Sequence, residues 1–452
     1  MVTPLNRIAT LSAAFLGSNL ARAALGFALT LAIGRGLGAH RFGQWVLCTT
    51  WASLLTVAAD LGFGVLLTRD GARPGAPAAR LVAGALRLRL AVAIPFAVIL
   101  YASAGRLSAE PEAIAGLRVG ALLGIAGAAY GCFGAMLQSQ ARWLPMVLGL
   151  ETGWLALQLA GSWWLVQTGS GGSGGSGGLV GSGWTGGLGR AGEAGQSGGT
   201  LVDLMVLATC VQLAQIATAL VLWRSVFGGR RRTDEGREPL IALMRRALPF
   251  AASGIVANLQ SRVAPMMLGA LSTAAELGLF AAASRFGRLA LLAPQAVFGG
   301  ALPVLSHEFG RNRPEAQRLF SRLDRAMLAF SASSAAVCVL AAPLMLRIVY
   351  GAPFMAAAPA LIWVGVGLIP ALSNAGRQIA LYASGGEAVV VRWRAVALIV
   401  QVASAVILIP AIGSTGAAAS VAAGEAAVWL PLRRAMASRA ERDLQLSLAA
   451  SP

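Results

Sequence analysis

Residues 11–33 read LSAAFLGSNLARAALGFALTLAI, an apolar run with a single charged residue, Arg22, at its centre. A helix rises about 1.5 Å per residue, so a run of this length crosses the hydrocarbon core of a bilayer. Arg22 would then lie roughly 16 Å from either surface, farther than its side chain can snorkel. Because a charge at that depth needs a partner, a cavity or an anionic ligand, the stretch predicts a membrane span that carries a functional residue.

The composition of the whole chain points to the same class of protein. Its 452 residues are 57% hydrophobic and only 12% charged, whereas soluble domains carry about 25% charged residues. In lipid the backbone must satisfy its own hydrogen bonds, and long apolar runs without two-residue alternation do so as helices. We therefore predict an all-α, polytopic membrane protein.

Further apolar runs of similar length follow along the chain, and together they predict about twelve spanning helices. The predicted spans cover residues 11–33, 44–67, 82–104, 117–138, 144–166, 201–223, 247–270, 277–302, 326–348, 358–383, 393–411 and 414–432. An even number of spans places both termini on the same side of the membrane.

Two segments divide the series of spans. Residues 167–199 are rich in glycine and serine and predict a flexible outer loop. Residues 224–246 carry two runs of arginine and predict a basic cytoplasmic linker. The resulting domains are an N-terminal six-helix lobe over 1–223, a C-terminal six-helix lobe over 247–436 and a cytoplasmic tail over 437–452.

The positive charge of the chain indicates its orientation. All 36 basic residues are arginine and the net charge is +18, but most arginines fall between apolar spans, which argues against nucleic acid as a partner. They are concentrated in alternate loops, and by the positive-inside rule both termini are then cytoplasmic. Because arginine stays protonated in proteins, none of these side chains can carry a transported proton.

The two halves show signs of an internal repeat. Asn19 precedes Arg22 in the first span, and Asn258 precedes Arg262 in the seventh. Two copies with the same topology would be related by an axis along the membrane normal, a plan known among transporters. We therefore place both asparagines with the arginines in the candidate substrate site.

Arginines deep inside predicted spans are the candidate substrate ligands. Arg285 and Arg288 are three residues apart, so they share a helix face and repel each other unless an anion lies nearby. A pyrophosphate would fit, because guanidinium groups bind phosphate in a bidentate manner. The alternative is that deep arginines pair with acidic residues of other helices. The candidates are Arg22, Arg262, Arg285, Arg288 and, nearer the inner end of its span, Arg377.

Few acidic residues lie deep enough to cancel this charge. Asp60 and Glu425 lie within spans, and Glu151 is a further potential partner in the fifth span. Even if Asp60 and Glu425 both form ion pairs, positive charge remains, which favours an anionic substrate. The same two acids are also the candidates for a coupling ion, so an ion-pair role and an ion-coupling role both stay open.

Several segments resemble a known transporter family. They are GRGLGAHRFGQW (34–45), DLGFGVLLTRDGAR (60–73) and ELGLFAAASR (276–285). These segments resemble polysaccharide-biosynthesis flippases, including O-antigen flippases, of the multidrug/oligosaccharidyl-lipid/polysaccharide (MOP) exporter superfamily. The resemblance extends over nearly the whole chain apart from the Gly/Ser-rich loop.

The resemblance implies a fold and a function. It implies two six-helix lobes around a central cavity that opens alternately to either side of the bacterial plasma (inner) membrane. The implied substrate is an isoprenoid pyrophosphate that carries an oligosaccharide, moved across the membrane for surface polysaccharide or lipopolysaccharide biosynthesis. The implied partners are this lipid-linked oligosaccharide, membrane lipid and the polysaccharide polymerase machinery.

Two other functions compete with the flippase. A drug or cation antiporter of the same superfamily would favour acidic residues in its cavity, and the excess of deep arginine argues against it. A membrane glycosyltransferase or polymerase would need acids in a sizeable outer segment, yet the largest outer loop has one acid, Glu193. We expect a transporter rather than an enzyme, with no cofactor and no metal, since the four cysteines lack metal-ligand spacing.

Overall fold

The computed structural model describes residues 4–71, 77–140, 143–170, 201–227, 240–292, 313–383 and 386–449. Every element among them is helical, which confirms the all-α prediction. Most of the predicted Gly/Ser-rich loop and part of the predicted basic linker lie outside the described residues. The chain forms two compact units, Met1–Asn258 and Leu259–Pro452; the lobe boundaries predicted above stay a prediction.

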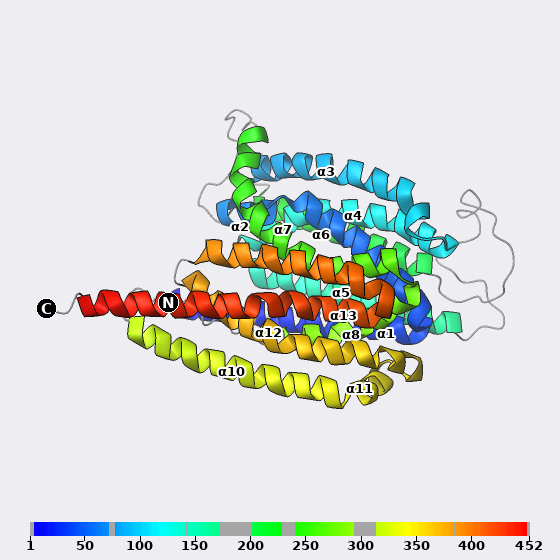
Figure 1. The fold of residues 1–452 in the computed structure, drawn as a ribbon. Helices are drawn as coiled ribbons and strands as arrows, with labels where there is room; N and C mark the ends of the chain where they lie inside the picture. The colour runs from blue at the N-terminus through cyan, green and yellow to red at the C-terminus, as the bar shows by residue number, and fades with distance from the viewer. Residues whose placement is uncertain are drawn as a thin grey trace. The chain divides into compact units, whose positions relative to one another are not determined.

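The first unit begins with a long helix that contains a break. Helix α1 has non-helical geometry at Gly38, whose φ of 74° lies in the left-handed region that favours glycine. This break separates the first two predicted spans. The helices of the unit are α1 (Pro4–Asp60), α2 (Phe63–Gly71), α3 (Ala78–Leu107), α4 (Pro111–Gln138), α5 (Leu144–Ser170), α6 (Leu201–Phe227) and the first part of α7 (Leu240–Leu271) (Figure 1).

Helix α4 lies at the centre of the first unit and packs against α1, α3 and α6. Its small residues let the neighbouring backbones approach closely. A Cβ atom at Gly124 would lie 2.9 Å from the carbonyl oxygen of Ala52 on α1, and one at Gly120 would lie 3.3 Å from that of Cys48. The glycines of α4 therefore set the distance between the two helices.

The second unit is organised around α12, which packs against α8, α10 and α13. Helix α13 is broken at Ile412 and Gly413, between the last two predicted spans. The elements are the rest of α7, α8 (Ala274–Ala290), α10 (Arg313–Leu340), α11 (Ala342–Val349), the 3-10 helix η2 (Ala352–Ala357), α12 (Ala358–Ala383) and α13 (Glu387–Ala449) (Figure 1).

Glu276 of α8 hydrogen-bonds to the backbone at the break in α13. Ser414 N donates to Glu276 Oε2 at 2.7 Å, so the carboxylate satisfies an amide at the start of the second half of α13. A Cβ at Gly413 would lie 2.6 Å from the same oxygen. Glu276 is itself positioned by Thr273, which caps α8. The segment ELGLF (276–280) therefore links the start of α8 to the start of the second half of α13.

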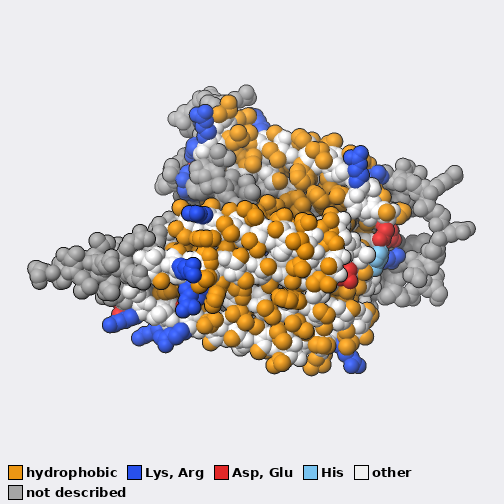
Figure 2. Space-filling model, in the orientation of Figure 1, with side chains coloured by type: hydrophobic (Ala, Val, Ile, Leu, Met, Phe, Trp, Pro, Cys, Tyr) orange, Lys and Arg blue, Asp and Glu red, His pale blue; other side chains and the backbone are white. Residues whose placement is uncertain are grey.

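The surface of the described helices is that of a membrane protein. Among the described residues, seven helices are long and apolar enough to cross a bilayer, and the two longest, Gly17–Asp60 and Ala388–Ser438, each overlap two predicted spans. Large apolar side chains are exposed, with Leu340 at 84% and Ile407 at 71%. Figure 2 shows hydrophobic side chains across most of the visible described surface. This is a multi-pass arrangement, and each predicted span overlaps a described helix.

Candidate functional site: a polar cavity and an arginine cluster

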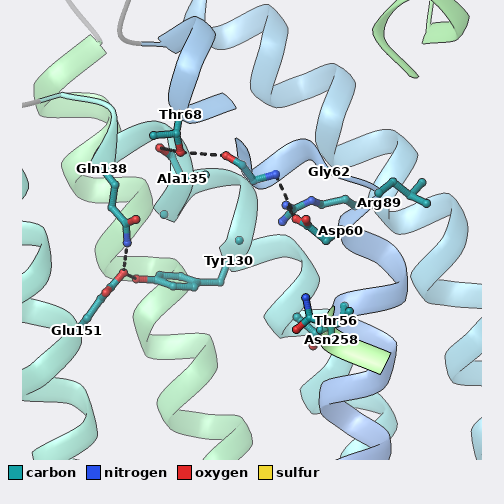
Figure 3. A pocket seen from close by; sticks show the side chains of 15 residues that line it. Thr56, Asp60, Gly62, Thr68, Arg89, Tyr130, Ala135, Gln138, Glu151 and Asn258 are labelled. Carbon is teal, nitrogen blue, oxygen red and sulfur yellow. Dashed lines mark hydrogen bonds and ion pairs between the residues drawn. The ribbon is translucent and has the colours of Figure 1, made fainter. Parts of the chain in front are cut away.

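A polar cavity of about 390 Å³ lies within the first unit (Figure 3). Its volume is in the range typical of ligand sites, about 300–1,000 Å³. Side chains from α1 to α5 line it, together with Asn258 from α7, which was a predicted site residue. The charged and polar side chains around it are those of Thr56, Asp60, Thr68, Arg89, Tyr130, Gln138, Glu151 and Asn258.

One wall of the cavity is a break in the second predicted span. Helix α1 ends at Asp60 and α2 begins at Phe63, with Leu61 at φ 46° and Gly62 at φ 79° between them. Leu61 is the one non-glycine residue with positive φ among the described residues. Irregular backbone inside a span is tolerated where it lines a cavity, and strain of this kind clusters at functional sites.

Asp60 connects this break to a buried arginine. Its Oδ1 accepts from Gly64 N at 3.2 Å, which caps α2, and forms an ion pair with Arg89. The Arg89 side chain is 3% exposed, and its Nη1 donates to Ala128 O at 3.2 Å. Gly131 makes room for it, because a Cβ there would collide with the guanidinium group.

Arg22 is paired with Glu151, across the helices α1 and α5. Its Nη2 donates to Asn19 Oδ1 at 2.7 Å, so these two predicted site residues are in contact. Glu151 Oε1 also accepts from Tyr130 Oη at 2.8 Å and Gln138 Nε2 at 2.9 Å. The structure therefore gives Arg22 the acidic partner that was the alternative to ligand contact.

The second unit has arginines on α8 that, unlike Arg22, have no acidic partner among the described residues. Arg288 is exposed, and its Nη2 donates to Ser284 Oγ at 3.0 Å. Arg285 and Arg262 lie within electrostatic range of Arg288, so three predicted site residues do come together. Among the described residues, no carboxylate acts on Arg285 or Arg288. We call Arg285 and Arg288 the α8 arginines.

Tyr350 is a neighbour whose ionised phenolate would offset the positive charge of Arg285 and Arg288, but its phenol stays protonated. It packs edge-on against Phe286 of α8, with ring centroids 6.4 Å apart. Burial raises the pKa of the Tyr350 phenol to about 12, although the charges of Arg285 and Arg288 act to lower it. The phenol is therefore neutral at physiological pH, and the cluster keeps its positive charge.

Glu425 lies in a buried network of the second unit. It is 9% exposed, and it accepts from Arg394 Nη1 at 2.6 Å, Asn374 Nδ2 at 2.9 Å and Gln260 Nε2 at 3.2 Å. Of its two predicted roles, this geometry matches the ion pair.

Arg377 has contacts of its own rather than joining the α8 arginines. It pairs with Asp324 at 3.5 Å and lies 5.4 Å above the Trp429 ring.

The sequence reasoning missed the arginines that pair with the deep acids. Arg89 and Arg394 fall inside the predicted spans 82–104 and 393–411, yet neither is among the predicted site residues. Their position inside apolar runs was the available signal. Tyr130 and Gln138 gave no such signal, because neither is charged and only packing brings them to Glu151.

Comparisons with known proteins bear on the fold. No protein-family model and no curated protein matches the chain. An inward-facing multidrug resistance MATE family transporter of the MOP superfamily matches with a TM-score of 0.70 and 14% identity, over 93% of this chain and 96% of that chain. The lipid II flippase MurJ, in an inward closed conformation, matches with a TM-score of 0.69 and 11% identity, over 93% and 86%. The chain has the fold of MOP superfamily transporters.

A third similar structure is a MOP superfamily transporter from Pyrococcus furiosus, with a TM-score of 0.56 and 13% identity over 96% of both chains. Its description states a binding pocket of reversed polarity and suggests a different function. The fold is thus found with drug exporters and with a lipid flippase, so the substrate must be argued from the side chains of this chain.

Proposed function

We propose that this protein is a flippase that moves an isoprenoid-pyrophosphate-linked oligosaccharide from the cytoplasmic to the outer leaflet for surface polysaccharide biosynthesis. The observation that carries the proposal is the pair of α8 arginines, Arg285 and Arg288, on which no described carboxylate acts. Two like charges three residues apart in a predicted membrane span favour an anion, and guanidinium groups suit phosphate in particular. A lipid II flippase has the same fold, so the fold accommodates a lipid-linked substrate.

The mechanism that fits is alternating access without chemistry on the substrate. The α8 arginines would bind the pyrophosphate while the isoprenoid tail stays in the bilayer, which spares the polar head group from contact with lipid. The arginine bias of the loops favours an inner-membrane protein with both termini cytoplasmic. On this proposal, the polysaccharide polymerase machinery would use the lipid delivered to the outer leaflet.

A drug or cation antiporter is the competing function, because MATE transporters share the fold. Such a protein needs a carboxylate that is available to a cation. Asp60, Glu151 and Glu425 are instead each paired with an arginine. The charge of each of these three carboxylates is therefore neutralised by an arginine, while no described carboxylate acts on the α8 arginines.

Translocation in proteoliposomes tests the proposal. The probe is a fluorescent isoprenoid pyrophosphate that bears one N-acetylglucosamine, and protection from an impermeant quencher measures the leaflet. The double variant Arg285→Gln/Arg288→Gln should lower the rate about tenfold or more, since charge-assisted hydrogen bonds contribute about 1.5–3 kcal/mol. Arg325→Gln, an exposed arginine of α10, is the matched control. A double variant as fast as the control, or export of cationic dyes by the unchanged protein with no lipid translocation, would overturn the proposal.

A further inference from the structure

We infer that the cavity of the first unit is a saccharide subsite, which binds a neutral, hydroxyl-rich part of the head group rather than its phosphate. This inference rests on the proposed function and assigns recognition of the sugar to residues of the first unit. It depends on which hydrogen-bonding groups around the cavity are already used and which are left over.

The charges around the cavity cancel. Arg89 pairs with Asp60, and Arg22 pairs with Glu151. The guanidinium groups are also committed to further acceptors, Ala128 O for Arg89 and the side-chain oxygen of Asn19 for Arg22. An anion would need net positive charge, and the two ion pairs leave none on these arginines, although Arg89 Nε is buried without a hydrogen-bond partner.

Apart from Arg89 Nε, the unused groups on Asp60, Gln138 and the two threonines are acceptors. Both hydrogen bonds to Asp60 end on Oδ1, and no described residue bonds to Oδ2. Gln138 donates Nε2 to Glu151, and because a carboxylate only accepts, this bond fixes the amide and leaves Oε1 for a ligand. The hydroxyls of Thr56 and Thr68 donate to backbone carbonyls, so their oxygen lone pairs also remain. Ligand hydroxyl and acetamido N–H groups are the matching donors.

An aromatic side chain completes the match. Tyr130 lines the cavity, and its hydroxyl is held by Glu151 (Figure 3). Gly134 lies beside the ring, where a Cβ would be 3.3 Å from the nearest ring carbon. A fixed ring with an apolar face and a polar tip suits a pyranose, which presents C–H groups on its faces and hydroxyls at its edge. Charge, hydrogen bonding and shape thus agree on a sugar.

The arrangement is also preorganised. Glu151 holds Tyr130, Gln138 and Arg22 at once, so the wall that a sugar would contact is ordered before it binds. Such a site loses less conformational entropy on binding than one built from free side chains. This assigns Glu151 a positioning role, because its own oxygens are occupied by its partners.

Equilibrium binding of two lipids to the full chain in nanodiscs tests the inference. The probes are isoprenoid pyrophosphate bearing one N-acetylglucosamine and the same lipid without the sugar. The double variant Thr68→Val/Gln138→Leu keeps side-chain size but removes the two polar groups. It should raise the Kd of the sugar-bearing lipid about tenfold and leave that of the bare lipid unchanged. Gln212→Leu on α6, whose side chain bonds to Gln215, should leave both Kd values unchanged.

The two lipids separate failure of the inference from failure of the proposed function. Equal affinity of the unchanged protein for both lipids, or an equal loss for both in Thr68→Val/Gln138→Leu, overturns the saccharide subsite and leaves the flippase standing. No binding of either lipid to the unchanged protein overturns the proposed function and the subsite with it. The unaltered Kd for the bare lipid also reports that the variant is folded.

Discussion

The two units differ in one group of arginines. Arg377 and Arg394 of the second unit are paired with carboxylates, as arginines of the first unit are, but the α8 arginines are not. In the first unit, Arg22 and Arg89 are each joined to a carboxylate and to a second acceptor. In the second unit, the α8 arginines carry like charges on one helix face, and no described carboxylate acts on them. A paired arginine is explained by its partner, whereas an unpaired one is a standing cost that favours an anionic ligand. The depth of an arginine in the membrane therefore identifies a residue that needs a partner. Whether that partner is a carboxylate of the protein distinguishes a structural arginine from a candidate ligand-binding one.

The largest expected effect is on stability, and it separates the two kinds of arginine. Asp60→Ala leaves Arg89 buried and unpaired and removes the cap of α2, which should cost about 3 kcal/mol of unfolding free energy. Arg288→Met removes a charge that has no acidic partner and should cost less than about 1 kcal/mol. Denaturant unfolding in detergent measures both. Equal losses in the two variants would contradict the distinction between paired and unpaired arginines.

The next prediction gives the α8 arginines of the second unit a carboxylate partner, as Arg22 and Arg89 have in the first unit. Ser284 Oγ lies 3.0 Å from Arg288 Nη2, so Ser284→Asp should place a carboxylate within ion-pair distance of Arg288. We expect translocation of the sugar-bearing lipid to fall about tenfold, because the new ion pair competes with the substrate phosphate. Ser284→Asn, similar in size but neutral, should remain within about twofold of the unchanged protein. If the aspartate variant transports as fast as the asparagine variant, the α8 arginines do not bind the phosphate.

A smaller effect is expected when Arg22 of the first unit loses its carboxylate partner and so resembles the α8 arginines. Glu151→Gln keeps an acceptor for Tyr130 but removes the charge that is paired with Arg22. The released arginine should lower the Kd of the bare pyrophosphate lipid about threefold, a gain limited by the exposure of Arg22 to solvent. The same binding assay measures it. An unchanged or raised Kd would show that an unpaired arginine is not sufficient to bind the anion.

The smallest effect concerns Tyr350. Because burial raises the pKa of its phenol to about 12, the group stays protonated and neutral through the physiological range. Its charge would appear only as the pH rises toward 12, so it cannot neutralise the α8 arginines below that. Tyr350→Phe should change translocation less than about twofold and leave the profile between pH 6 and 9 flat. A profile that differs between the two proteins in this window would contradict a neutral phenol.

Much of the fold follows from the sequence because lipid imposes a simple rule. Apolar runs of sufficient length must be helices, and both long kinked helices break at glycines between predicted spans, Gly38 and Gly413. The pairing of charges does not follow in the same way. Arg22 and Glu151 are 129 residues apart, and which acid an arginine meets depends on how α1 and α5 pack.

The candidate site was predicted where local spacing is sufficient. Arg285 and Arg288 share a face because they are three residues apart, and the structure keeps them together with Arg262. The cavity of the first unit was not predicted, since its wall depends on the left-handed turn at Leu61 and Gly62 and on neutral side chains from several helices. Such features come from tertiary packing, which periodicity and charge counts do not record.

Direct binding of the bare isoprenoid pyrophosphate tests the central claim, that the α8 arginines of the second unit form the anion site. The comparison is between Arg285→Gln/Arg288→Gln and Thr68→Val/Gln138→Leu, one double variant in each unit, with Arg325→Gln as control. The account predicts that the arginine variant raises the Kd at least about tenfold while the other two leave it unchanged. An unchanged Kd in the arginine variant, or an equal rise in both double variants, would contradict it.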